Sequence, residues 1–478
     1  MKILLVVLAV VALAADAAEL KVEKLKRNLV RVREMVTEGS GMNRYGVLSR
    51  YEAAESDATR TGGLSLLGQE VTVEKKGDGY LLRFPLAKGE CVYGLGDVSR
   101  ANIQRRPGKY EIWVKNINSY IPIPMFITSK GWGVLINTTW RNEIDVGATD
   151  RDAIICTATK SPIDFYLFTG EGYRELLDTY TELTGRPALL PVFGYGFAYV
   201  CNQWIDQFSL MREAQEFRDR NLPCDVIGLE PGWMENFYDF TTHKRWDPDK
   251  FFIPAWNPTG RITFIRALER NGFKLSLWLC CDYDLYRYEE ELLGGKPVVD
   301  LKSEKKVGSN ADGETFHDKN IENPEILKER GAYSCAQMRR DASKRLYSRK
   351  TLPEGAEPWF EHLKTFVDMG VRCFKLDGCR QVTEHDPARK WANGMTTEEA
   401  HNLYPLVYDK QMARGFEEHT GKRAMVYSAG GYAGVQQYVA TWAGDTGGGK
   451  KPLVSVLNLG LTGHPNQSCD MEQFSMPG

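Results

Sequence analysis

The sequence has 478 residues, which is too long for one ordinary domain, so two or more folded units are expected. Hydrophobic residues make up 42% of the chain and charged residues 26%, a composition that excludes a largely disordered protein. The formal net charge is -2, and no stripe of Lys and Arg alternates with aromatic residues, so nucleic acid is not an expected partner.

The first residues have the pattern of a signal peptide. Lys2 precedes an apolar run from Ile3 to Ala15, and Ala15-Asp16-Ala17 offers small residues for cleavage. We expect residues 1–17 to be removed and the protein to be secreted or periplasmic. The run is shorter than the ~20 residues that cross a bilayer, so no transmembrane segment is expected after cleavage.

Residues 18–185 alternate short β-type runs with turns, which predicts an N-terminal antiparallel β-sandwich. The runs are VTVEK, YLLRFPL, KYEIWV, IPMFITS, GWGVLIN and IDFYLF. The segment Tyr173 to Thr184 then has apolar residues at helical spacing, and Gly185-Arg186-Pro187 ends it. This helix and its stop mark a join to a second domain.

Residues 186–478 alternate strands with amphipathic helices, the pattern of βα units around a parallel sheet. We predict helices at about 205–221 and 260–271, and a long insertion at about 285–356. The strand positions lie in FGYGFAYV, DVIGLE, KLSLWLCC, RCFKLDG, KRAMVYSAG, ATWAGD and the segment that leads into GHPNQSCD. Seven positions predict an α/β domain with a (β/α)₈ (TIM) barrel that is incomplete at its C-terminal end.

Reactive groups in such barrels gather at the C-terminal ends of the strands. The acidic residues at these positions are Glu230, Asp282, Asp377, Asp445 and Asp470. A pair of carboxylates, one ionised and one protonated, is what glycoside hydrolysis needs, although a strand-end Asp is often only a helix cap or an ion-pair partner.

Two of these acidic residues have informative neighbours. Lys375 precedes Asp377 by two residues and so shares its strand face, where an ammonium would favour an ionised nucleophile. Trp442 precedes Asp445, and an aromatic ring that excludes water favours a protonated acid. Lys375 could instead form a Schiff base, as in barrel aldolases.

Several motifs together resemble family 31 of the glycoside hydrolases over almost the whole mature length. They are CVYGLGD, IPIPMFITSKGWGVLIN, IDFYLFTG with YTELTGRPALLP, RCFKLDG, and YVATWAGD. The resemblance implies that the β-sandwich is galactose-mutarotase-like and that the enzyme cleaves terminal α-linked sugars with retention. The sequence itself suggests no metal or organic cofactor.

The resemblance also assigns roles to individual residues. It implies that Asp377 is the nucleophile, Asp445 is the acid/base, and Lys375 stabilises the nucleophile. Trp278 falls at the sugar-pocket Trp of the family, and Asp470 falls at its later strand-end Asp.

Departures from the family pattern concern substrate choice. Glu230 stands where many members have a shorter Asp, which leaves less depth in the pocket, and Ser428-Ala429 stands where Ser-Arg is common. The missing Arg would leave space for a substituent on the sugar, such as a 2-acetamido group. We therefore expect an α-N-acetylgalactosaminidase, an α-galactosidase or an α-xylosidase rather than an ordinary α-glucosidase. The family's eighth strand, its pocket histidine and its C-terminal β-domains would follow Gly478, so we expect a partial sequence.

Other functions are compatible with the same residues. The scaffold could serve a transglycosylase or an α-glucan lyase, and Lys375 leaves a lysine-dependent aldolase open. A non-catalytic carbohydrate-binding protein could use the aromatic side chains of Trp204, Trp233, Trp278 and Trp442 to stack on sugars. The His residues are scattered without ligand spacing, so no metal is expected, and the oligomeric state is left open.

Overall fold

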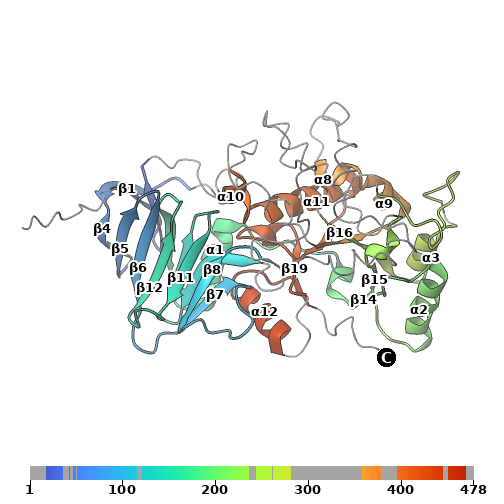
Figure 1. Ribbon diagram of the computed structural model, residues 1–478, viewed down its shortest axis with the longest axis horizontal. Helices are drawn as coiled ribbons and strands as arrows, with labels where there is room; N and C mark the ends of the chain where they lie inside the picture. Colours follow the sequence, from blue (N-terminus) through green and yellow to red (C-terminus); the bar gives the residue numbers. More distant parts are fainter. Residues whose placement is uncertain are drawn as a thin grey trace, which may run out of the picture.

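The computed structural model describes residues 18–35, 42, 47–49, 51–115, 121–235, 244–260, 262–280, 358–377, 396–444 and 450–469. The predicted signal peptide and the predicted insertion therefore lie outside the described residues. Figure 1 shows two domains side by side, a β-sandwich in blue to cyan and a domain of alternating helices and strands in green to red.

The N-terminal domain consists of two antiparallel sheets. One has the order β3-β1-β2-β13-β10-β9-β7 and the other β4-β5-β6-β12-β11-β8. The strands are β1 (Glu19–Lys26), β2 (Leu29–Glu34), β3 (Glu55–Arg60), β4 (Gly62–Leu66), β5 (Gln69–Lys76), β6 (Gly79–Pro85), β7 (Val92–Gly96), β8 (Gly108–Ile112), β9 (Pro122–Thr128), β10 (Trp132–Ile136), β11 (Asn142–Val146), β12 (Ala153–Ala158) and β13 (Asp164–Thr169). The predicted β-sandwich is confirmed.

Aromatic side chains form the centre of this sandwich. Phe84 of β6 packs edge-on against Phe126 of β9 and Phe165 of β13, with ring centroids 5.9 and 5.6 Å apart. Because β6 belongs to one sheet and β9 and β13 to the other, these rings join the two layers.

The second domain contains a parallel sheet with the order β14-β15-β16-β17-β18-β19-β20 in the described part of the chain. Its strands are β14 (Ala198–Val200), β15 (Val226–Leu229), β16 (Lys274–Cys280), β17 (Cys373–Asp377), β18 (Met425–Ser428), β19 (Ala440–Trp442) and β20 (Gln467–Ser468). Six of them lie at predicted positions, whereas β20 lies within GHPNQSCD and not in the segment before it. Seven parallel strands in chain order are one fewer than a closed (β/α)₈ barrel has, so the predicted incomplete barrel is confirmed.

The described helices lie between or beside the strands of the parallel sheet, except that the first of them packs against β9, β10 and β13 of the β-sandwich. They are α1 (Tyr173–Thr184), η2 (Val192–Tyr195), α2 (Gln207–Asp219), η3 (Pro231–Trp233), α3 (Phe264–Arg270), α8 (Pro358–Glu361), α9 (Lys364–Met369), α10 (Thr397–Ala400), α11 (Tyr404–Thr420), η6 (Val435–Gln437) and α12 (Lys450–Gly460). The helix α1 has the predicted bounds. In the described part of the chain, no helix is long and apolar enough to span a membrane.

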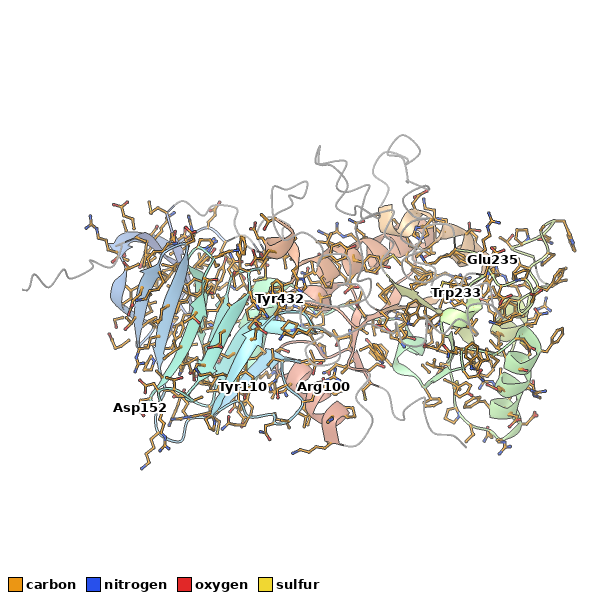
Figure 2. All side chains as sticks on the ribbon, viewed as in Figure 1. Arg100, Tyr110, Asp152, Trp233, Glu235 and Tyr432 are labelled. Carbon is orange, nitrogen blue, oxygen red and sulfur yellow. The ribbon has the colours of Figure 1, made fainter. Side chains whose placement is uncertain are left out.

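The two domains pack closely together. The Trp113 ring of the N-terminal domain stacks on His401, with ring centroids 3.7 Å apart. Tyr432, labelled at the junction in Figure 2, donates a hydrogen bond from its buried hydroxyl to the carbonyl oxygen of Thr138 at 2.8 Å. A buried polar group needs such a partner, so these contacts fix the β-sandwich against the carboxyl ends of the barrel strands.

Candidate active site

The described candidate residues gather at the carboxyl ends of neighbouring barrel strands. Glu230 directly follows β15, Lys375 and Asp377 end β17, and Trp442 ends β19. Trp278 of β16 lies beside Lys375 in the strand register, so their side chains share the inner face of the sheet. Five side chains from four strands thus line one end of the barrel.

Lys375 contacts two of these side chains. Its Nζ lies 3.2 Å from Oε1 of Glu230 and 4.1 Å from the centroid of the Trp442 ring. The side chains of Lys375 and Glu230 are only 6% and 14% exposed, so this ion pair is weakly screened by solvent. Lys375 therefore links strand ends that lie on either side of it.

The Asp377 carboxylate accepts a hydrogen bond from the indole of Trp278. The distance from Trp278 Nε1 to Asp377 Oδ2 is 3.1 Å, and both side chains are buried. An N–H group that donates to a carboxylate stabilises its ionised form and fixes the orientation of its oxygens. The bond therefore fixes how the nucleophile candidate is oriented at the end of β17.

Trp233 supports this arrangement from the neighbouring strand end. Its Nε1 donates to the carbonyl oxygen of Trp278 at 3.0 Å. The Trp233 ring is buried against Trp246 and Phe366, with centroids 5.1 and 5.3 Å away, and Figure 2 shows it in the interior of the barrel domain. In this structure Trp233 thus holds the backbone of a site residue, while its predicted contact with sugar stays a prediction.

Two polar residues of the inner face escaped the sequence analysis. Tyr427 of β18 lies beside Lys375 in the register, and its hydroxyl is 3.3 Å from Oγ of Ser276. Burial raises the pKa of Tyr427 to about 12, although the positive charge of Lys375 opposes this rise. The hydroxyl therefore stays protonated and polar. Its place could have been inferred from the alignment of MVYS with CFKLD.

Ala429 lies next to the nucleophile candidate at the end of β18. Its backbone N–H donates to the carbonyl oxygen of Leu376 at 2.9 Å, and its side chain is buried. Ser428 is also buried, and its Oγ donates to the carbonyl oxygen of Gly430 at 2.9 Å. Ala429, which stands where the resemblance predicts a common Arg, therefore lies beside the peptide group that precedes Asp377.

Some predicted site residues cannot be placed. Asp282, Asp445 and Asp470 lie outside the described residues, although Gly444, which directly precedes Asp445, is described. Within the described ranges, no group of three His, Cys, Asp or Glu side chains is arranged to hold a metal ion.

Comparison with known families agrees with this geometry. The glycosyl hydrolases family 31 TIM-barrel domain matches residues 187–477, and the glycosyl hydrolase 31 N-terminal galactose mutarotase-like domain matches residues 18–145. The chain belongs to glycoside hydrolase family 31. The predicted family is therefore confirmed.

Two related enzymes are each 24% identical in sequence to this chain over the aligned residues. An α-xylosidase of Emericella nidulans is 24% identical over 421 residues, which are 83% of this chain and 47% of the relative. An α-glucosidase of Saccharolobus solfataricus is 24% identical over 442 residues, which are 88% of this chain and 61% of the relative. The chain spans about half the length of the relatives it matches.

Solved structures of the family share the fold. A dextranase of Flavobacterium johnsoniae in complex with glucose aligns with a TM-score of 0.67 at 19% identity, over 96% of this chain and 60% of its own. An α-xylosidase from a soil metagenome in complex with xylose aligns with a TM-score of 0.66 at 18% identity, over 97% of this chain and 71% of its own.

Proposed function

We propose that this chain carries the N-terminal and barrel domains of a retaining α-glycosidase, with Asp377 as the nucleophile and Asp445 as the acid/base. The observation that supports it most is the arrangement of Asp377, whose carboxylate is buried and oriented by the Trp278 indole at 3.1 Å. Membership in family 31 supports a role for a second carboxylate, because the retaining mechanism of glycoside hydrolysis uses a pair about 5 Å apart.

The proposed reaction has two displacements. In the first, a carboxylate oxygen of Asp377 forms a bond to the anomeric carbon while Asp445 gives its proton to the leaving glycosidic oxygen. In the second, Asp445 takes a proton from water, the water oxygen bonds to the anomeric carbon, and the ester to Asp377 breaks. The Trp278 N–H group keeps one oxygen of Asp377 occupied throughout.

Glu230 and Trp442 would form the wall of the sugar pocket, with Lys375 between them. The contact of Glu230 with Lys375 at 3.2 Å holds a carboxylate that is one methylene longer than the Asp common in the family. A longer side chain at the pocket wall favours a sugar without an exocyclic hydroxymethyl group. We therefore favour an α-xyloside as substrate, and α-xylosidases are among the relatives of this chain.

A panel of 4-nitrophenyl α-glycosides tests the substrate proposal. We expect the highest kcat/KM for the xyloside, compared with the glucoside, the galactoside and the N-acetylgalactosaminide. A higher value for the N-acetylgalactosaminide would indicate that the space at Ala429 receives a substituent of the sugar, and it would overturn the xyloside assignment.

A mechanism-based fluoro-xyloside tests the nucleophile assignment. It should label Asp377 covalently, as mapped by mass spectrometry of the digested protein, because the trapped intermediate is an ester of the nucleophile. A label on Asp445 or Glu230 would overturn the assignment.

The lysine-dependent aldolase is less well supported. The Lys375 ammonium lies between the Glu230 carboxylate and the Trp442 ring, and both contacts favour its charged form over the neutral amine that attacks a carbonyl. Trapping of Lys375 by borohydride with a carbonyl substrate would reverse this preference.

We also propose that the protein is exported. Lys2 and the apolar run from Ile3 to Ala15 support this proposal. A carbohydrate polymer or glycoconjugate outside the cell would then be the source of the substrate.

A further inference from the structure

An ion pair of the N-terminal domain contacts the barrel beside the active site. Asp97 directly follows β7 and is fully buried, and Arg100 lies three residues later. The distance from Arg100 Nη2 to Asp97 Oδ2 is 2.9 Å, and the Arg100 side chain is 8% exposed. Asp97 closes the CVYGLGD motif, which the proposed reaction does not otherwise use.

Both members of the pair reach across to the barrel domain. Arg100 Nη1 donates a hydrogen bond to the carbonyl oxygen of Gly444 at 3.0 Å, and Ser455 of α12 donates to Oδ1 of Asp97. Figure 2 shows Arg100 beside α12 at the junction of the domains. Gly444 directly precedes Asp445, and Ser455 lies ten positions after Asp445. The pair therefore holds the chain on both sides of the segment that contains Asp445.

The same backbone position is coupled to the sugar pocket. A Cβ atom at Gly444 would lie 1.7 Å from a ring carbon of Trp442, so the Trp442 ring covers this glycine. The same ring also contacts the Lys375 ammonium, which lies 4.1 Å from its centroid. Gly444 is thus fixed by Arg100 at its carbonyl oxygen and by Trp442 at its Cα.

The chemistry of arginine suits this role. Its planar guanidinium presents several N–H donors in a fixed geometry, so Arg100 can bind the Asp97 carboxylate and the Gly444 carbonyl oxygen at once. A buried charge must keep its partners, because leaving one unpaired is strongly destabilising. This requirement restricts the Gly444 carbonyl oxygen to positions within hydrogen-bonding distance of Arg100.

We propose that Arg100, oriented by Asp97, is a positioning residue for proton transfer in the active site. It holds the carbonyl oxygen of Gly444, the residue before Asp445, so a side chain of the β-sandwich domain fixes the backbone position from which Asp445 follows. This inference rests on the proposed function of Asp445. It predicts that the leaving-group step, rather than stability alone, depends on Arg100.

The test compares Arg100→Lys with Arg33→Lys. Arg33 is a matched control because it also forms a buried pair in the same domain, with its Nε 2.9 Å from Oε2 of Glu23 and with side chains 6% and 10% exposed. Each variant keeps the charge and loses the planar fork. Two substrates are used, phenyl α-xyloside, whose leaving group needs a proton, and α-xylosyl fluoride, whose leaving group needs little help.

We expect Arg100→Lys to lower kcat/KM for the phenyl xyloside by roughly 10- to 100-fold and to change the value for the fluoride much less. Arg33→Lys should change both substrates equally. An equal loss on both substrates in Arg100→Lys, or the same bias in Arg33→Lys, would overturn the proposal.

Two further measurements separate the possible failures. If Asp445→Asn itself shows no leaving-group bias, the acid/base assignment fails; if Asp445→Asn shows it and Arg100→Lys does not, only the positioning role fails. Amide hydrogen exchange needs no turnover, and it should become faster in the peptide from Trp442 to Val456 in Arg100→Lys but not in Arg33→Lys. Unchanged exchange there would contradict the inference even without activity.

Discussion

Replacement of Glu230 by Asp tests whether the length of this side chain determines which sugar the active site prefers. The change withdraws the carboxylate by about 1.5 Å, the length of one C–C bond. The present contact of Glu230 Oε1 with Lys375 Nζ is 3.2 Å, so the shortened side chain cannot reach the ammonium without a shift of the backbone. The pocket wall then retreats by one methylene group, and a charge-assisted hydrogen bond is lost.

Both consequences have a size. A hydrogen bond to a charged group contributes about 1.5–3 kcal/mol, so the melting temperature should fall by a few degrees. One methylene in a pocket changes substrate discrimination by about 1–3 kcal/mol, or roughly 10- to 200-fold. We therefore expect Glu230→Asp to raise the kcat/KM of the α-glucoside relative to the α-xyloside by roughly tenfold or more.

The assay is kcat/KM for both 4-nitrophenyl glycosides, together with thermal unfolding. Glu213→Asp is the matched control, because Glu213 accepts a hydrogen bond from the Tyr199 hydroxyl at 3.0 Å on the helix side of the sheet. This variant should lose stability without a change in selectivity. If Glu230→Asp loses stability and keeps the wild-type ratio of the two substrates, Glu230 does not set the depth of the pocket.

Three other outcomes are expected. Trp278→Phe keeps an aromatic ring but removes the N–H donor to Asp377, so kcat/KM should fall roughly 10- to 100-fold. The control Trp132→Phe loses an indole–carboxylate hydrogen bond in the β-sandwich and should leave kcat/KM unchanged. Equal effects of the two substitutions would mean that Trp278 acts only through stability. Burial lowers the pKa of His464 to about 3. Below pH ~6.5 the His464 side chain is therefore protonated in the unfolded chain but stays neutral in the folded protein, so the free energy of unfolding decreases as the pH drops from ~6.5 toward 3. The loss is about 2 kcal/mol at pH 5, and His464→Gln should remove it, as judged from melting temperatures at pH 5 and 7; an identical pH dependence in the variant would refute this explanation. N-terminal sequencing of the exported protein should begin near Ala18, and a start at Met1 would contradict the predicted cleavage.

The barrel strands were predictable because parallel strands are buried on both faces. Such strands form continuous apolar runs, as in the segment from Val226 to Leu229, and these runs stand out from their charged surroundings. Helix ends were less certain. The predicted helix at about 260–271 begins instead at Phe264, because the side chain of Thr263 caps it by accepting from the N–H of Arg266 at 3.3 Å.

The candidate site was predictable only along single strands. The two-residue period placed Lys375 and Asp377 on one face, and the structure has them there. The partner of Lys375 was not predictable, because Glu230 lies 145 positions away and reaches it across β16. No local pattern in the sequence shows that the side chains of Glu230 and Lys375, from the ends of β15 and β17, come within hydrogen-bonding distance of each other.

The position of Lys375 changes what its substitution would reveal. The sequence suggests a lysine that serves the nucleophile, but in the structure its ammonium also contacts Glu230 and Trp442, which lie at the ends of strands on either side of β17. Loss of this cation would leave the buried Glu230 carboxylate without that partner and would free the Trp442 ring that covers Gly444. A defect in a Lys375 variant would therefore combine nucleophile, sugar recognition and acid/base geometry. The separate substitutions at Trp278, Glu230 and Arg100 each change one of these, so they, and not Lys375, can assign the roles.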